Sequence, residues 1–123
     1  MSRSLYPFEL EIAERFSTGG KASVSPKGEW IRGYLLEFRE GNPYNMWKEY
    51  VEFAKYIGVR PGTYTNFKTY MWILKKLGLI TLVRREGSSR GFGKTIYAIA
   101  EGMENSELWR NPMQAAYPST DWK

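Results

Sequence analysis

Apolar side chains recur at helical spacing in four successive segments between residues 5 and 77. Residues three or four positions apart lie on one face of an α-helix, so each segment predicts an amphipathic helix with one buried stripe. The expected stripes are Leu5, Phe8, Ile12 and Phe16; Ile31, Tyr34, Leu35 and Phe38; Met46 or Trp47 with Tyr50, Val51, Ala54 and Ile57; and Phe67, Tyr70, Met71, Leu74 and Leu77. The pattern therefore predicts four helices around a shared apolar core.

Capping and helix-breaking residues mark the expected ends of these helices. The start signals are Ser4 with Pro7, Ser25 with Pro26, Asn42 with Pro43, and either Thr63 or Thr65. The stop signals are Gly19-Gly20, Gly41, Gly58 and Gly78. Between the third and fourth helices, Arg60-Pro61-Gly62 predicts a tight turn.

The periodicity changes after Gly78. Residues 79–85 and 94–100 are rich in β-branched and apolar types and partly alternate with polar ones, which predicts two short strands. Residues 86–93 lie between them and contain three glycines and two serines, which is typical of a hairpin loop. The expected fold class is therefore mainly α with a small antiparallel β-hairpin.

The C-terminal segment, residues 101–123, is less regular. A short helix is expected at 105–110. The segment carries Trp109, Tyr117 and Trp122, whereas disordered tails are usually poor in aromatic residues. We therefore expect this extension to dock on the body of the protein.

The positive charge of the chain is concentrated in one segment. Residues 58–100 contain eight basic residues and one acid, Glu86, which gives +7, whereas the other residues have ten bases and twelve acids. The eight bases are Arg60, Lys68, Lys75, Lys76, Arg84, Arg85, Arg90 and Lys94. A field of one sign on one part of a small protein attracts an oppositely charged partner, and a polyanion is the usual one.

The composition excludes several kinds of chemistry. The chain contains neither Cys nor His, so Cys- or His-ligated zinc sites and Ser–His or Cys–His catalysis cannot form. Gly93-Lys94-Thr95 is similar to part of a phosphate-binding loop, but Ser88 stands where that loop needs glycine. We expect a cytoplasmic protein that is not an enzyme and has no metal and no cofactor.

Acidic and aromatic residues have ordinary explanations at their spacing. The acids are expected on solvated helix faces: Glu9, Glu11 and Glu14; Glu37 and Glu40; Glu49 and Glu52. Most helix aromatics are expected in the core, with stacking on single-stranded nucleic acid left open for a few of them: Trp30, Tyr34, Trp47, Tyr50, Phe53 and Tyr56.

One stretch resembles a known superfamily. Residues 72–80, with the sequence Trp-Ile-Leu-Lys-Lys-Leu-Gly-Leu-Ile, are similar to the end of the recognition helix in winged helix-turn-helix regulators. In those proteins a Leu-x-x-x-Gly-Leu-Ile pattern leads into the first strand of the wing. The resemblance covers residues 28–100, with the wing at 79–100. The N-terminal helix and the C-terminal tail lie outside the resemblance. We expect one domain at 1–100, made of an N-terminal helix and loop at 1–24 and the winged-helix core at 28–100.

Under this resemblance the fourth helix and the wing are the candidate DNA-binding site. The outer helix face and its flanks are expected to meet the major groove through Tyr64, Thr65, Asn66, Lys68, Thr69, Trp72 and Lys76. The wing is expected to contact backbone or minor groove through Arg84, Arg85, Arg90 and Lys94. The simpler interpretations are a solvated helix face and a plain hairpin loop.

The expected function is sequence-specific binding of double-stranded DNA, by a transcriptional regulator or a viral or plasmid DNA-site protein. A homodimer is a possible partner arrangement, with the N-terminal helix and the aromatic tail as candidate contacts. No membrane contact is expected. The alternative is a winged-helix protein-interaction module in a larger assembly, with Trp72 and the tail aromatics as the contact surface.

Overall fold

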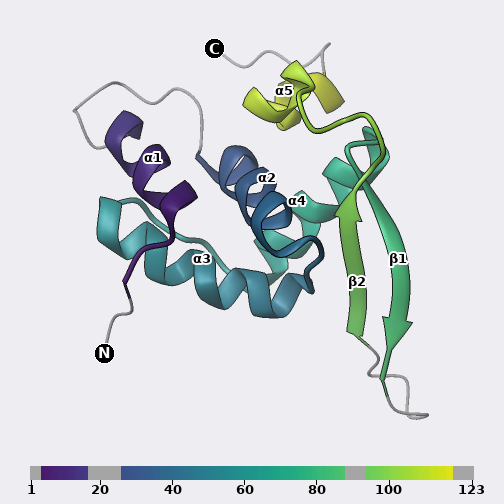
Figure 1. Ribbon diagram of the computed structural model, residues 1–123, viewed down its shortest axis with the longest axis horizontal. Coiled ribbons are helices and arrows are strands. Elements are labelled where there is room, and N and C mark those ends of the chain that lie inside the picture. The colour runs from purple at the N-terminus through teal and green to yellow at the C-terminus, as the bar shows by residue number, and fades with distance from the viewer. Residues whose placement is uncertain (1–3, 17–25, 88–93, 118–123) are drawn as a thin grey trace.

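The computed structural model describes residues 4–16, 26–87 and 94–117, and these form a mainly helical protein with a small antiparallel hairpin (Figure 1). The helices are α1 (Pro7–Phe16), α2 (Lys27–Phe38), α3 (Pro43–Ile57), α4 (Tyr64–Lys76), the 3-10 helix η1 (Glu107–Arg110) and α5 (Pro112–Ala116). The strands are β1 (Ile80–Glu86) and β2 (Lys94–Ile99). The predicted fold class is confirmed at this level. None of the helices in the described ranges has the length and apolar character needed to cross a membrane.

Local capping chemistry explains where α3 and α4 begin. The Asn42 side chain accepts a hydrogen bond from the Asn45 N–H at 3.1 Å, and Thr63 Oγ1 accepts one from the Asn66 N–H at 3.1 Å. Each bond satisfies an N–H group that has no partner within the helix. Thr63, not Thr65, is therefore the cap of α4. The predicted cap Ser25 lies outside the described residues.

Glycines end α3 and α4 as predicted. Gly58 has φ 79° and Gly78 has φ 81°, in the left-handed region that glycine adopts without steric cost. The prediction for α2 was wrong, because this helix ends at Phe38, and Arg39 follows it with a positive φ of 74°. Gly41 has another role: an added Cβ there would lie 2.6 Å from Met46 Sδ, so this backbone is packed too closely for a side chain.

The connection between α3 and α4 is not the predicted tight turn. It is a six-residue segment, 58–63, whose only turn is at Gly58. The segment runs back along α3, and Trp47 Nε1 donates a hydrogen bond to the Gly62 carbonyl at 3.2 Å (Figure 1). This tertiary bond holds the linker extended, whereas the Arg60-Pro61-Gly62 sequence suggested a local reversal.

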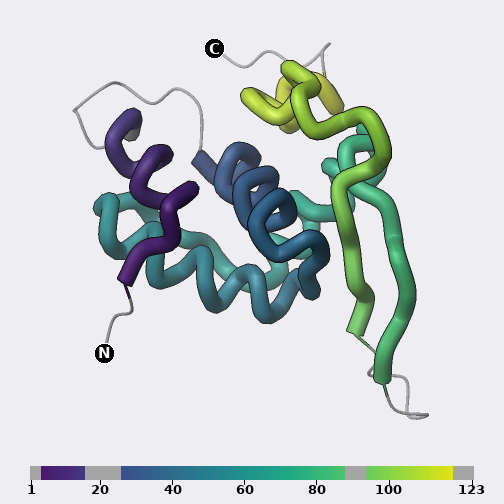
Figure 2. Tube along the Cα trace, in the orientation of Figure 1, coloured from purple at the N-terminus to yellow at the C-terminus, as the bar shows by residue number. Residues whose placement is uncertain are grey.

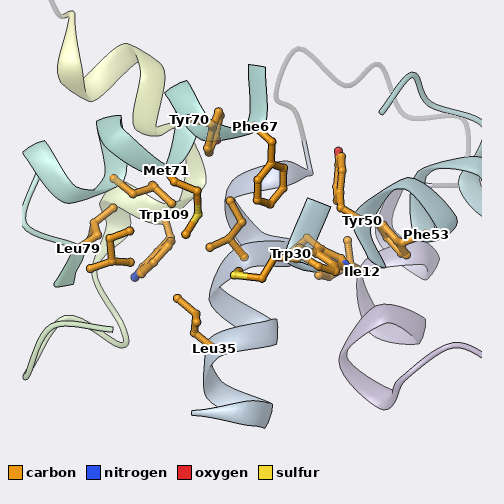
Figure 3. Close-up of a cluster of buried hydrophobic side chains, with 14 of the residues drawn as sticks. Ile12, Trp30, Leu35, Tyr50, Phe53, Phe67, Tyr70, Met71, Leu79 and Trp109 are labelled. Atoms are coloured by element: carbon orange, nitrogen blue, oxygen red, sulfur yellow. The ribbon is translucent and has the colours of Figure 1, made fainter. Parts of the chain in front are cut away.

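The core is formed by α1 to α4 together with the start of β1 and Trp109 of η1, and Trp30 is fully buried within it (Figure 3). The Trp30 ring lies 5.3 Å from Tyr50 and 6.4 Å from Phe67, in edge-to-face geometry that aromatic pairs favour. Met46 is fully buried and Trp47 only partly, so Met46 is the member of the third apolar stripe for which the sequence left the two residues open. Phe53, which lay outside that stripe, is also fully buried.

The apolar stripes were wrong at two further positions. Phe38 is exposed because it is the last residue of α2, where its ring packs on Tyr34 at 4.6 Å at the edge of the core. Ile73 is buried although it lies off the predicted stripe of α4. The buried side of α4 is wider than the stripe because α4 packs against β1 and α5 as well as α3.

Glu9 is not on a solvated face. Its side chain is 0% exposed, its Oε2 accepts a hydrogen bond from Trp30 Nε1 at 2.8 Å, and its Oε1 accepts one from the Tyr6 N–H at 2.9 Å. A buried carboxylate needs such donors because desolvation is costly. The prediction failed here because the buried Trp30 needs an acceptor for its indole N–H, and Glu9 of α1 supplies it.

The two strands pair antiparallel, from Ile80 opposite Ile99 to Glu86 opposite Lys94. A bulge interrupts the register between Leu82 and Arg84. Gly41, in the connection between α2 and α3, forms an additional antiparallel bridge with Tyr97 of β2. The hairpin is thus joined to the helices on its β2 side.

The described part of the C-terminal segment docks on the helices, as predicted. The chain returns from β2 to α2 and α4 through η1 and α5 (Figure 2). Trp109 is 2% exposed and its Nε1 donates to the Met103 carbonyl at 2.8 Å. The expected short helix is η1, and α5 was not predicted. Trp122 lies outside the described residues.

Candidate nucleic-acid interface

Helix α4 presents a continuous polar and basic surface to solvent. Phe67, Tyr70, Met71 and Leu74 hold the opposite side in the core, so the rotation of the helix about its axis is fixed. The sequence of α4 contains three lysines and no acid. All three lysines, Lys68, Lys75 and Lys76, are exposed.

The outer-face residues predicted from the helical wheel are exposed and lie together. These are Thr65, Lys68, Thr69, Trp72 and Lys76, and Asn66 beside them is also exposed. Tyr64 is partly buried at the first turn of the helix. Their exposure follows from the packing of the buried stripe, and their contact with DNA stays a prediction.

Trp72 has its ring in solvent, with 55% of the residue exposed. Lys76 Nζ lies 5.3 Å from the centroid of the Trp72 ring and 5.6 Å from that of Tyr117. An ammonium between two ring faces gains cation–π energy, about 0.5–1 kcal/mol at exposed sites. Tyr117, which follows α5, thus reaches the C-terminal half of the outer face of α4, whereas Thr65, Lys68 and Thr69 in the N-terminal half are exposed among the described residues.

Arg84 of the hairpin is held by two carboxylates. Its Nη2 donates to Glu40 Oε1 at 2.5 Å, its Nη1 to Glu40 Oε2 at 3.1 Å, and its Nε to Glu86 Oε2 at 2.7 Å. These bonds raise the pKa of Arg84, and the Arg84 guanidinium holds the pKa of Glu40 below its usual range. Two acids therefore oppose the charge that Arg84 was expected to offer to a phosphate.

The other hairpin cations differ from Arg84. Arg85 and Lys94 are exposed at the end of the hairpin where β1 stops and β2 starts, and where Arg85 pairs with Thr95 and Glu86 with Lys94 in the register. Within the described ranges, no carboxylate forms an ion pair with Arg85 or Lys94. Arg90, the expected tip of the wing, lies outside the described residues.

Lys27 is a cation near the start of α4 that the sequence reasoning missed. Its Nζ lies 5.3 Å from the centroid of Tyr70 and 5.7 Å from that of Tyr50, and burial lowers the pKa of Lys27. An added Cβ at Gly62 would lie 3.9 Å from the same Nζ, so the ammonium is beside the segment that leads into α4. Lys27 lies far from the basic segment in sequence, and only packing brings it here.

Tyr44 and Lys48 at the start of α3 were also missed, whereas Trp47 and Tyr64 were named separately as candidates. Tyr44 and Trp47 lie against Tyr64, with Lys48 beside Tyr44. The sequence signal was present, because Tyr44 falls on the polar side of the α3 stripe, but nothing in the sequence placed it next to α4.

The candidate interface offers ammonium and guanidinium donors, hydroxyl and amide groups, and aromatic rings. In the portion of the chain that the structure describes, no three Asp or Glu residues gather as a metal site would require. Comparisons with protein-family models, with curated proteins and with solved structures gave no match.

Proposed function

We propose that this protein is a winged-helix protein that binds double-stranded DNA sequence-specifically. The order of elements supports the fold, because three helices, α2, α3 and α4, are followed by the two strands of a wing, β1 and β2. Gly41, between α2 and α3, pairs with Tyr97 of β2 and takes the place of a short third strand. Helix α1 and the segment after β2 are additions to this arrangement.

The observation that carries the proposal is the outer face of α4. It is a capped, acid-free helix whose exposed residues are lysines, threonines, an asparagine and a tryptophan. Lys contacts phosphate or guanine, Asn binds adenine, and the Thr methyl group packs on thymine. A helix with this surface, fixed in rotation by its core side, has the shape and chemistry to enter a major groove.

In this mechanism the two parts of the site have different tasks. Helix α4 reads base edges through Asn66, Lys68 and Thr69. The hairpin holds the backbone through Arg85 and Lys94, and Arg90 of the loop is expected to join them. Binding is noncovalent and releases the counterions condensed on the phosphates.

Salt titration of duplex binding tests the proposal. With about four to six phosphates neutralised per protomer, log affinity falls with log salt at a slope of about −4 to −5. Selection of bound sequences from a random DNA pool at physiological salt then gives the site and the spacing of any half-sites. Absence of binding at low salt, or an affinity that does not change with salt, contradicts the proposal.

A biological role as a transcriptional regulator, or as a DNA-site protein of a virus or plasmid, follows from this mode of binding. The second candidate is a protein-interaction module. It is favoured by the exposed ring of Trp72, because the Lys76 ammonium lies over both this ring and the ring of Tyr117. Sedimentation velocity of the wild type and Trp72→Ala distinguishes the two, because loss of self-association with DNA affinity retained supports the interaction module.

A further inference from the structure

The N-terminal turns of α3 and α4 bring three aromatic rings together at the surface. We call Tyr44, Trp47 and Tyr64, with the adjacent Lys48 and Lys68, the aromatic patch. Ring centroids are 5.2 Å apart for Tyr44 and Tyr64, 5.8 Å for Trp47 and Tyr64, and 5.9 Å for Tyr44 and Trp47. Each ring therefore contacts the other two, and the patch is one surface built from both helices.

Two of the rings are held in place and the third is open. Trp47 donates its indole N–H to the Gly62 carbonyl at 3.2 Å, and Tyr64 is partly buried, which raises the pKa of its phenol. Tyr44 is 45% exposed. A fixed aromatic surface binds a flat partner with little loss of side-chain entropy.

Lysines lie on the rings of the patch. Lys48 Nζ is 5.1 Å from the Tyr44 centroid, and Lys68 Nζ is 5.4 Å from the Tyr64 centroid. No carboxylate of the described residues pairs with either lysine. Because these two ammonium groups contact ring faces and no carboxylate, they are available to bind phosphates. When a lysine moves from a ring to a phosphate, the face of that ring becomes exposed.

The position of the patch links it to the outer face of α4. Lys68 belongs to both surfaces, and Tyr64 is one helical turn before it. Rings with adjacent cations are what proteins use to stack bases of single strands while holding the backbone. Paired bases inside a duplex offer only their edges, so ring-face stacking requires an unpaired base.

We propose that the aromatic patch holds an unpaired base of DNA next to the duplex bound by α4, with Tyr44 stacking on the base and Lys48 on its phosphate. The inference rests on the proposed function, because the duplex on α4 brings the base to the patch. It predicts a preference for a duplex that continues into a single strand over one that is fully paired.

The test compares three kinds of DNA that share one duplex. One is blunt-ended, one has a three-nucleotide extension at either the 5′ or the 3′ end, and one has an abasic extension of equal length at the same end. The abasic extension has the same added phosphates without bases. For the better of the two ends, the wild type binds the base-containing extension about tenfold more tightly than the abasic one, which equals about 1.4 kcal/mol. With 2-aminopurine as the first extended base, its fluorescence falls on binding.

Matched variants assign the effect to the patch. Tyr44→Ala loses the preference and keeps its affinity for the blunt duplex, whereas Tyr44→Phe retains both. Tyr56→Ala is the control, because Tyr56 is on the same helix, is 68% exposed and lies outside the patch. Melting temperatures of all variants verify that each is folded.

Two results overturn the inference while leaving the proposed function intact. In the first, the wild type binds DNA with the base-containing extension and DNA with the abasic extension equally well, while its binding to blunt duplex still depends on salt. The other is a preference that persists in Tyr44→Ala. If no duplex binds at low salt, the proposed function fails and the inference fails with it.

Discussion

Single side chains of this protein carry roles that their sequence neighbourhood does not indicate. Glu9 sits among other acids on α1, yet it is buried and bonded to Trp30. Arg84 sits in the most basic part of the chain, yet it is bonded to Glu40 and Glu86. In both cases a partner distant in sequence, Trp30 for Glu9 and Glu40 for Arg84, determines which interaction the charged group makes.

The Glu9 contact gives a stability prediction. Glu9→Ala removes the acceptor of a buried indole N–H and lowers the free energy of unfolding by about 1–3 kcal/mol. Glu11→Ala, at an exposed position of the same helix, changes it by less than about 0.5 kcal/mol. Urea titration monitored by circular dichroism measures both values. Equal effects of the two substitutions would show that Glu9 is not the buried acceptor.

The Arg84 contact gives a binding prediction. Glu40→Gln removes one of the two charges that oppose Arg84, so the guanidinium becomes available to phosphate. Affinity for duplex DNA rises, and the salt slope becomes steeper by up to about one. Glu37→Gln, an exposed acid in the last turn of α2 and three residues before Glu40, removes the same charge from the protein without changing Arg84. Equal gains in affinity for both variants would mean that net charge alone is responsible.

At the scale of elements, α4 is defined by the contrast between its two sides. Its buried side is fixed by Phe67 and Leu74, and its outer side includes Trp72 and Lys68. The hairpin is an extension that the Gly41 bridge ties to the helices. This arrangement makes the two parts of the proposed interface separable by substitution.

Trp72→Ala tests the outer side of α4. Because Trp72 is exposed, the melting temperature stays nearly unchanged, with a cost below about 0.5 kcal/mol. Affinity for duplex DNA falls if this face enters the groove. Calorimetry and fluorescence anisotropy measure the two effects. A large drop in melting temperature would place the ring in the core, and unchanged affinity would remove Trp72 from the interface.

The division of tasks between helix and hairpin is tested with three further variants. Arg85→Ala weakens binding to all sequences similarly and reduces the salt slope by about one. Lys68→Ala or Asn66→Ala instead relaxes the preference at particular base pairs of the selected site, with a discrimination loss of about 1–3 kcal/mol for a lost bidentate contact. If all three variants act equally on selected and random DNA, α4 is not the reading helix.

At the scale of the whole molecule, the segment after β2 is part of one folding unit. Trp109 is buried against the body, and the Gly28 backbone is packed so tightly that an added Cβ would lie 2.6 Å from the Trp109 carbonyl. The helices and the C-terminal segment therefore share one core.

Trp109→Ala is expected to lower the free energy of unfolding by about 3–5 kcal/mol, the usual cost of removing a core Trp. Trp72→Ala is the matched control, since it removes the same side chain from an exposed site. Thermal unfolding followed by circular dichroism measures the difference. A small effect at Trp109 would show that the C-terminal segment folds as a separate unit.

The sequence by itself determined the four long helices, the two strands and most of their exposed and buried sides. Helical periodicity, Thr63 and Asn42 caps, and left-handed Gly58 and Gly78 act through contacts within a few residues of the chain. Such contacts are readable from spacing alone. For this reason the outer face of α4 was predicted residue by residue.

Tertiary structure alone decided which groups meet across long separations. Four contacts join segments that no local pattern connects. They are Glu9 with Trp30, Arg84 with Glu40, Gly41 with Tyr97, and Tyr44 with Tyr64. The physical reason is that close packing in three dimensions sets both the burial of a polar group and the partner that compensates it. Local sequence fixes which side of a helix faces solvent, whereas the charge and stacking surface of the proposed interface exist only once the helices pack.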